Sequence, residues 1–186
     1  MQGFVRIIAG QWRGKRLQVP SIRDLRPTPD RVRETLFNWL APVIHGARCL
    51  DLFAGSGVLG FEALSRGAAY VAMVDQSAEI VSLLQHELHQ FKATNADIYC
   101  ATVPAGLPPV KKPFDIVFLD PPYQANLLLQ TCQFLEEHHY LANSCHIYLE
   151  ACENIKDNDL PKTWQLLKAK KAGQVYYHLA FREINE

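Results

Sequence analysis

A carboxylate followed by two prolines and an aromatic residue, Asp120-Pro121-Pro122-Tyr123, comes directly after FDIVFL, the clearest buried strand in the sequence. An exocyclic amine on a nucleic-acid base is a poor nucleophile because its lone pair is delocalised into the ring. Asp120 and the Pro121 carbonyl could accept its N–H groups and orient it, and the two prolines stiffen the turn because their φ is fixed. We therefore predict that these four residues form an amine pocket in which methyl transfer occurs, with Tyr123 stacked on a flipped or unpaired base.

A glycine-rich segment, DLFAGSGVLG, follows a second strand-like run at 48–53. Its Gly55, Gly57 and Gly60 fit the spacing GxGxxG at the carboxyl end of a parallel strand, where open α/β sheets bind their ligands. Glycine allows the backbone to approach a ligand closely or to adopt a positive φ. Taken alone, this spacing is compatible with a nicotinamide or flavin cofactor as well as with S-adenosylmethionine.

Two acids at strand ends narrow the choice of cofactor. Asp51 would attract the ammonium and sulfonium groups of S-adenosyl-L-methionine but would repel the pyrophosphate of a dinucleotide, although it could instead simply cap the following turn. Asp75 ends the next strand, where it could accept hydrogen bonds from ribose hydroxyls in either class. We predict S-adenosyl-L-methionine as the cofactor. The predicted cofactor-binding residues are Asp51, Phe53, Gly55, Ser56, Gly57, Asp75, Gln76, Thr28 and Asp120.

The elements that must position these residues alternate between short apolar runs and helical patterns, which indicates βαβ units and a parallel sheet. The tail, WQLLKAKKAGQVYYHLAFRE, predicts an antiparallel hairpin around Ala172-Gly173. We expect an α/β, Rossmann-like class I methyltransferase fold, with a mostly parallel seven-stranded sheet that ends in this hairpin. The predicted strands lie near 48–53, 70–75, 97–101, 114–119 and 144–150, and the helices near 57–66, 77–91 and 124–139.

The N-terminal part is basic. Residues 1–33 hold eight Lys or Arg and two Asp, a net charge of +6 that the rest of this neutral chain balances. Residues 3–19 predict a hairpin, and Thr28 is a plausible N-cap for a helix that has Pro29 at its first position and ends before Pro42. This charge indicates contact with a polyanion, the alternative being a merely solvated face. The predicted RNA-binding residues, all expected on the surface, are Arg6, Arg13, Lys15, Arg16, Arg31 and Arg33.

Length and composition predict one domain over 1–186, with an arm at 1–24 and a catalytic core at 25–186. No run approaches the roughly 20 apolar residues of a membrane span, and the N-terminus has no signal-like segment. We therefore expect a soluble cytoplasmic protein, with a monomer favoured. Five cysteines without a CxxC pair indicate reduced thiols and no metal. A metal cluster would have to draw on residues with unusual spacing, namely His138, His139, Cys145, His146 and Cys152.

Over nearly its whole length the sequence resembles the bacterial 16S ribosomal RNA guanine-N2 methyltransferases of the RsmD type. The resemblance covers RIIAGQWRGKRLQVP, LRPTPDRVRETLFNWL, DLFAGSGVLG, VDQS, DPPY and the closing hairpin, and the second of these is the most specific. It implies methylation of the 2-amino group of a guanine in 16S rRNA, within the 30S subunit or an assembly intermediate. It also implies that the segment 28–33 closes over the cofactor or touches RNA. One departure is that IYCATVPAGL offers no acid after the third strand, which leaves adenine contacts near 100–103 undefined.

Five alternatives stay open from the sequence. DNA adenine or a different rRNA guanine could be the acceptor, although DNA enzymes usually add a target-recognition segment. Protein glutamine methyltransferases favour Asn at the position of Asp120. An oxidoreductase could use the GxGxxG turn, and a non-catalytic RNA-binding assembly factor could keep the fold as a scaffold.

Overall fold

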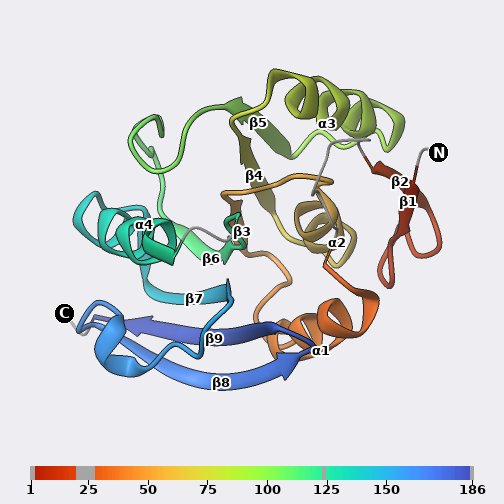
Figure 1. Ribbon diagram of the computed structural model, residues 1–186. Helices are drawn as coiled ribbons and strands as arrows, with labels where there is room; N and C mark the ends of the chain where they lie inside the picture. Colours follow the sequence, from red (N-terminus) through yellow and green to blue (C-terminus); the bar gives the residue numbers. More distant parts are fainter. Residues whose placement is uncertain (1–2, 20–27, 123–124, 185–186) are drawn as a thin grey trace.

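The protein forms one central sheet with helices on both faces, in a computed structural model that describes residues 3–19, 28–122 and 125–184 (Figure 1). The order of the strands in the sheet is β5-β4-β3-β6-β7-β9-β8. The helices are α1 (Asp30–Leu40), α2 (Val58–Ser65), α3 (Ala78–Gln90) and α4 (Ala125–Glu137), with a short 3-10 helix, η1 (Asp157–Asp159). The sheet strands are β3 (Arg48–Asp51), β4 (Tyr70–Asp75), β5 (Ala96–Cys100), β6 (Phe114–Leu119), β7 (Leu141–Ala151), β8 (Trp164–Ala172) and β9 (Val175–Glu183).

The chain reverses its direction of travel across the sheet between β3 and β6. It builds β3, β4 and β5 outward to one edge and then returns to place β6 on the other side of β3, with Asp51 beside Phe118. Such a switch point leaves a crevice at the carboxyl ends of the two strands, because their connections leave in opposite directions. The geometry of the sheet therefore fixes where a ligand can bind.

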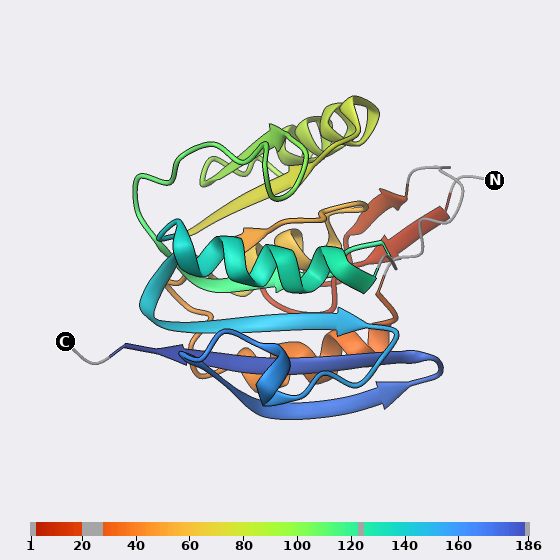
Figure 2. The same ribbon diagram turned by 60° about the vertical axis from the view of Figure 1, so that its left-hand side comes forward.

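The two faces of the sheet carry separate apolar cores. Residues of α1, α2 and α3 pack with Phe118 and Tyr148 on one face, whereas α4 packs with Leu119 and Leu149 on the other. Figures 1 and 2 show α4 on its own side of the sheet. Gly60 brings α2 close to β4, since a Cβ there would lie 2.7 Å from the Met73 Sδ atom. Among the described residues, no helix is long and apolar enough to cross a membrane.

The predicted fold class is confirmed. All five predicted parallel strands are present, and β9 lies antiparallel between β7 and β8. The predicted N-cap is wrong, because α1 begins at Asp30 and its N-cap residue is Pro29, which makes no side-chain cap. Thr28 instead lies buried with its hydroxyl bonded to carboxylates across the sheet edge. The Thr28 hydroxyl therefore interacts with residues distant in sequence, and not with the N-terminus of α1 as local sequence rules predict.

The N-terminal arm is a hairpin of β1 (Gly3–Arg6) and β2 (Arg16–Val19) that docks on α2. The carboxylate of Glu62, on α2, accepts the backbone N–H groups of Ile8 at 2.8 Å and Ala9 at 3.0 Å. Trp12 is buried against Phe61 and Phe91. The arm is thus packed on the core by its own apolar residues and by a buried acid.

Arg33 corrects the predicted RNA-binding set. It was expected on the surface of its helix, but its side chain is 0% exposed and lies 3.5 Å from the Glu62 carboxylate. It donates to the backbone carbonyls of Arg6 at 3.0 Å and Thr28 at 3.2 Å. The physical reason is that the arm covers this part of α1, a contact that helical periodicity does not reveal. A side chain so enclosed cannot meet a phosphate.

Candidate active site at the carboxyl edge of the sheet

A cleft of about 1260 Å³ opens at the carboxyl edge of the parallel strands, above the switch point. This volume exceeds the usual range for one small ligand, roughly 300 to 1000 Å³, and leaves room for a cofactor and an acceptor side by side. Nine of the predicted site residues line it: Thr28, Phe53, Gly55, Ser56, Asp75, Gln76, Asp120, Pro121 and Pro122. Tyr123 lies outside the described residues.

Asp75 presents a carboxylate on one side of the cleft. It ends β4, and its two carboxylate oxygens accept the backbone N–H of Gly55 at 3.0 Å and of Ser77 at 2.9 Å. Each oxygen keeps a second lone pair, and the side chain is only half-buried. Gly55 has a φ of +50°, so the turn beside Asp75 adopts a backbone conformation that favours glycine. The carboxylate therefore has spare capacity to accept hydrogen bonds from a ligand in the cleft.

An apolar strip adjoins Asp75 where the sequence leaves adenine contacts undefined. Ile80, Ala101 and Val103 line the cleft beyond the ends of β4 and β5. Ile80 and Val103 are buried, and Ala101 packs against the apolar core. A planar aromatic ring would meet hydrocarbon here, so recognition of an adenine needs no acid from β5.

Asp51 does not line the cleft. Its side chain is 3% exposed and accepts backbone N–H groups from Gly60, at 3.2 Å, and Phe53. Burial, opposed by these hydrogen bonds and reinforced by the charge of Asp75, raises the pKa of Asp51 to about 7. The geometry thus favours the alternative left open by the sequence, in which Asp51 holds the glycine turn. Its negative charge still acts on the cleft from behind that turn.

Gly57 also lies behind the cleft surface. It is the N-cap residue of α2, with a φ of +73°, and a Cβ there would lie 2.4 Å from the Leu84 side chain. Two of the predicted cofactor-binding residues, Asp51 and Gly57, therefore shape the turn, while Gly55 and Ser56 present it to the cleft.

Two carboxylates lie together on the other side of the cleft. The parallel register joins Phe118 to Tyr148 and Leu119 to Leu149, so the next residues along, Asp120 and Glu150, are neighbours. The hydroxyl of Thr28, just before α1, faces both carboxyl groups, lowers the pKa of each, and can donate its single hydrogen to one of them at a time. The Tyr148 hydroxyl donates to Glu150 at 2.6 Å.

This pairing holds both carboxyl groups away from their ordinary titration range. Burial raises the pKa of Asp120 well above its usual value, and the nearby charges of Glu150 and Asp51 raise it further, against a hydrogen bond from Thr28. Burial also raises the pKa of Glu150, while the Tyr148 and Thr28 hydroxyls lower it. No salt bridge among the described residues involves either group. The pair therefore favours a proton, a cation or an N–H donor.

Glu150 is the site residue that sequence reasoning missed. It is 6% exposed and lines the cleft next to Asp120. The available signal was its place in IYLEA, an acid at the carboxyl end of a predicted parallel strand. That signal carries weight only once β7 is known to pair with β6.

The remaining predicted RNA-binding residues are exposed. Arg6 and Arg16 lie on the hairpin strands, Arg13 and Lys15 in the turn between them, and Arg31 near the start of α1. Figure 2 shows the hairpin, in red, on the same side of the molecule as the arrowhead of β7. The strands of the arm lie on that side, whereas its turn packs on Ser65 and Phe91, at the ends of α2 and α3 far from the glycine turn.

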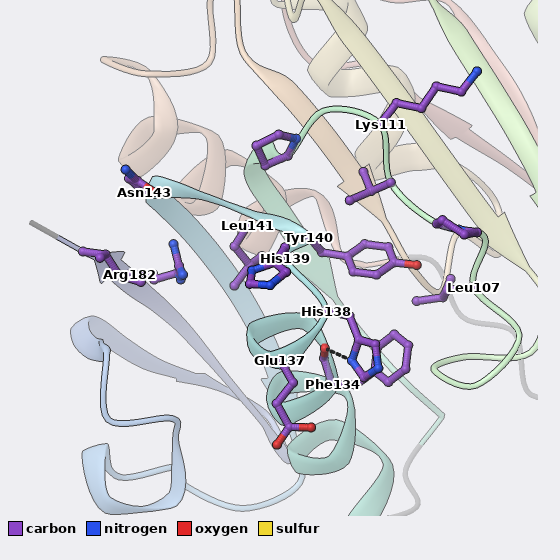
Figure 3. Close-up of a pocket in the computed structure, with 14 residues that line it drawn as sticks. Leu107, Lys111, Phe134, Glu137, His138, His139, Tyr140, Leu141, Asn143 and Arg182 are labelled. Carbon is purple, nitrogen blue, oxygen red and sulfur yellow. Dashed lines mark hydrogen bonds between the residues drawn. The ribbon is translucent and has the colours of Figure 1, made fainter. Parts of the chain in front are cut away.

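A second hollow, of about 800 Å³, lies at the opposite edge of the sheet, where β6 and β7 begin (Figure 3). Two of its polar side chains are engaged locally. Arg182 pairs with Glu136 at 2.7 Å, and the His138 ring lies 2.9 Å from the Phe134 carbonyl oxygen and stacks on the Phe134 ring. We assign it no part in the chemistry because Asp120 and the glycine turn lie at the other edge. In the described part of the chain, no three His, Cys, Asp or Glu side chains could hold a metal ion.

The sheet order, the reversed β9–β8 pair and the glycine turn at the switch point define a Rossmann-like methyltransferase fold. A solved putative methyltransferase from Escherichia coli matches it with a TM-score of 0.89 and 46% identity, covering 98% of this chain and 100% of that one. A putative methylase from Haemophilus influenzae matches with a TM-score of 0.82 and 41% identity, covering 98% and 100%.

The family assignment comes from the sequence comparisons. The family model described as conserved hypothetical protein 95 matches residues 5–181. The Ribosomal RNA small subunit methyltransferase D of Escherichia coli (strain K12) is 47% identical over 181 residues, which is 97% of this chain and 91% of that protein. The Haemophilus influenzae protein of the same name is 45% identical over 183 residues, or 96% and 94%. This chain belongs to that RsmD family.

Proposed function

We propose that this protein is an S-adenosyl-L-methionine-dependent methyltransferase that modifies the exocyclic 2-amino group of a guanine in small-subunit ribosomal RNA. One observation carries the proposal: Asp120 and Pro121 line the same cleft as Asp75 and the glycine turn. An amine acceptor and a nucleoside cofactor would thus meet at the switch point of the sheet. The names of the relatives support small-subunit rRNA as the acceptor.

The cofactor supplies an electrophilic methyl group. Asp75 would accept the ribose hydroxyls, Gly55 and Ser56 would lie along the methionine part, and the strip of Ile80 and Val103 would take the adenine. These residues fit the cofactor because Asp75, a carboxylate with spare acceptor capacity, lines the cleft together with the apolar strip.

Asp120 and the Pro121 carbonyl would accept the two N–H groups of the guanine amine and direct the nitrogen lone pair at the methyl carbon. The carbon–nitrogen bond forms as the carbon–sulfur bond breaks, and the alkylated nitrogen then loses a proton. Asp120, whose pKa is raised by burial, can take this proton. Fixing the amine in a stiff turn supplies orientation, which can be a large part of the barrier reduction.

The test is a methyl-transfer assay with labelled S-adenosyl-L-methionine on naked 16S rRNA and on 30S particles that lack the modification. Digestion to nucleosides should yield labelled N2-methylguanosine. Asp120→Ala should remove transfer while cofactor binding, measured by calorimetry, persists. If the label appeared in another nucleoside, or in a DNA duplex supplied in parallel, guanine in rRNA would be wrong as the acceptor. Binding of NAD in preference to S-adenosyl-L-methionine would overturn the cofactor assignment.

We infer that the exposed arm contacts the RNA backbone through Arg6, Arg13, Lys15 and Arg16. Reversing Arg13, Lys15 and Arg16 to Glu should weaken RNA binding and flatten its dependence on salt. The reason is that fewer phosphate contacts form, so fewer counterions leave the RNA on binding. Unaltered binding by this variant would mean that the arm is a solvated basic face without contact to RNA.

A further inference from the structure

The last part of β8 carries a group of lysines that the site described above does not use. Lys168, Lys170 and Lys171 are all exposed. Between Trp164 and Arg182 the sequence contains no Asp or Glu. This edge strand therefore presents positive charge without any acid of its own hairpin beside it.

The lysines lie next to the acceptor side of the cleft. The turn between β8 and β9 lines the cleft with Ala172, Gln174 and Val175, which immediately follow the lysines in the chain. Pro122, the exposed residue after Asp120 and Pro121, lines the same cleft. In Figure 2 the β8–β9 turn, in blue, projects on the same side as the red hairpin, with the two at opposite ends of that side.

The charges of these lysines are not neutralised within the described structure. None of its salt bridges involves them. The Lys170 ammonium lies 5.9 Å from the Trp39 ring centroid and that of Lys171 lies 4.6 Å from the Tyr176 centroid. Aromatic faces restrain an ammonium group but leave its full charge available to a further ligand.

The cleft itself creates a need for such cations. Asp120 and Glu150 lie at its acceptor side, and Asp51 adds negative charge from behind. The negative charge that these carboxyl groups keep, although reduced by their raised pKa values, opposes a polyanion at this edge, and positive charge beside them offsets it. The arm supplies positive charge on one flank only, and β8 is the basic element on the other.

We propose that Lys168, Lys170 and Lys171 form a second RNA-binding surface, the β8 lysine surface, which holds the phosphate backbone flanking the target nucleotide. The inference rests on the proposed function, since it takes RNA as the substrate. With the arm on one flank and the β8 lysine surface on the other, the RNA crosses the mouth of the cleft and the target base enters between them. Non-specific phosphate contacts of this kind fix register and orientation while the cleft reads the base.

The experiment compares two matched lysine pairs in the full chain. Lys170→Gln/Lys171→Gln removes two charges from the β8 lysine surface, and Lys111→Gln/Lys112→Gln removes two exposed charges before β6, at the opposite edge of the sheet. Binding to naked 16S rRNA and to 30S particles is measured without a methyl donor at 50 and 200 mM salt. The Lys170→Gln/Lys171→Gln variant is expected to bind RNA roughly tenfold more weakly at the lower salt. The slope of its log binding constant against log salt concentration should fall in magnitude by about 1.5. The control pair should bind like the parent protein.

Equal binding by the two variants would overturn the proposal. A loss seen with 30S particles but not with naked rRNA would assign the surface to a ribosomal protein and would also overturn it. Lys168→Gln, in a side chain that makes neither ring contact, keeps the test valid if the double variant unfolds, and it should show a smaller loss in the same direction. Because no methyl donor is present, these results stand apart from the methylation assay: absent methylation with lysine-dependent rRNA binding would sink the proposed function alone.

Discussion

Arg33 of α1 and Glu62 of α2 form an ion pair in which neither side chain is exposed, and this pair joins the N-terminal arm to the active-site cleft. Glu62 receives backbone N–H groups from the arm. Arg33 donates to the Arg6 carbonyl in the arm and to the carbonyl of Thr28, whose hydroxyl meets Asp120 and Glu150. The element expected to bind RNA is thus linked by hydrogen bonds to the element expected to hold the acceptor amine.

Removing one partner of this pair should destabilise the fold strongly. Glu62→Gln leaves the Arg33 guanidinium buried without its acid on α2, and the expected loss in the free energy of unfolding is about 3 kcal/mol. Denaturant unfolding measures it. Arg31→Met, on the same helix but exposed, should change stability by less than about 0.5 kcal/mol. The double variant Arg33→Met/Glu62→Gln should lose less than the sum of its single changes, and strict additivity would contradict a direct coupling.

The pH dependence of stability should reveal the buried Asp51. Its pKa in the folded protein is raised from 3.8 to about 7, chiefly by burial, so the folded state holds this proton in a range where the unfolded chain has released it. Its contribution to stability is therefore fully present below about pH 4 and is lost as the pH rises through about 7. Asp51→Asn should flatten the profile of unfolding free energy against pH across this window. Asp120 and Glu150 shift in the same direction, so some slope should persist in the variant.

The pH dependence of methyl transfer should respond to Glu150. Asp120 accepts hydrogen bonds more strongly when ionised and can take the amine proton only in that form, so the rate should fall as the pH drops through its raised pKa. Glu150→Gln removes a neighbouring negative charge that raises this pKa, and the acidic limb should therefore move to lower pH. Single-turnover rates between pH 5 and 9 measure the limb. Glu153→Gln, an exposed acid nearby in sequence, serves as the control, and an identical shift in it would mean that Glu150 has no specific effect.

The glycine turn should not tolerate a side chain at Gly57. The positive φ there is strained for alanine, and the added Cβ would lie 2.4 Å from the Leu84 side chain. Gly57→Ala should destabilise the protein by about 2 to 4 kcal/mol, combining backbone strain with overpacking. Gly14→Ala is the matched control, since its φ is +83° and no atom lies within 4 Å of its Cβ, so only the strain of about 1 kcal/mol remains. Thermal unfolding of both variants separates the strain from the overpacking. If the packing against α3 were loose, the two variants would lose the same stability.

Much of the site was predictable because its residues follow strands that local patterns reveal. Asp75 and Asp120 end apolar runs, and parallel strands bring their carboxyl ends to one edge, so both were expected in one cleft and both line it. Glu150 was missed because its partnership with Asp120 depends on the lateral pairing of β6 and β7, which the order of residues along the chain does not state.

The sequence by itself determined the class of fold and placed the glycine turn and Asp120-Pro121 at the ends of their strands, since these depend on short-range periodicity, on glycine spacing and on residues that follow one another. Only the tertiary structure decided which charges face solvent. Arg33 is buried because the arm covers α1, Asp51 lies behind the glycine turn, and Thr28, outside α1, is buried with its hydroxyl facing Asp120 and Glu150. The physical reason is the same in each case: burying a charged or polar group requires partners from distant segments, and those partners are chosen by packing.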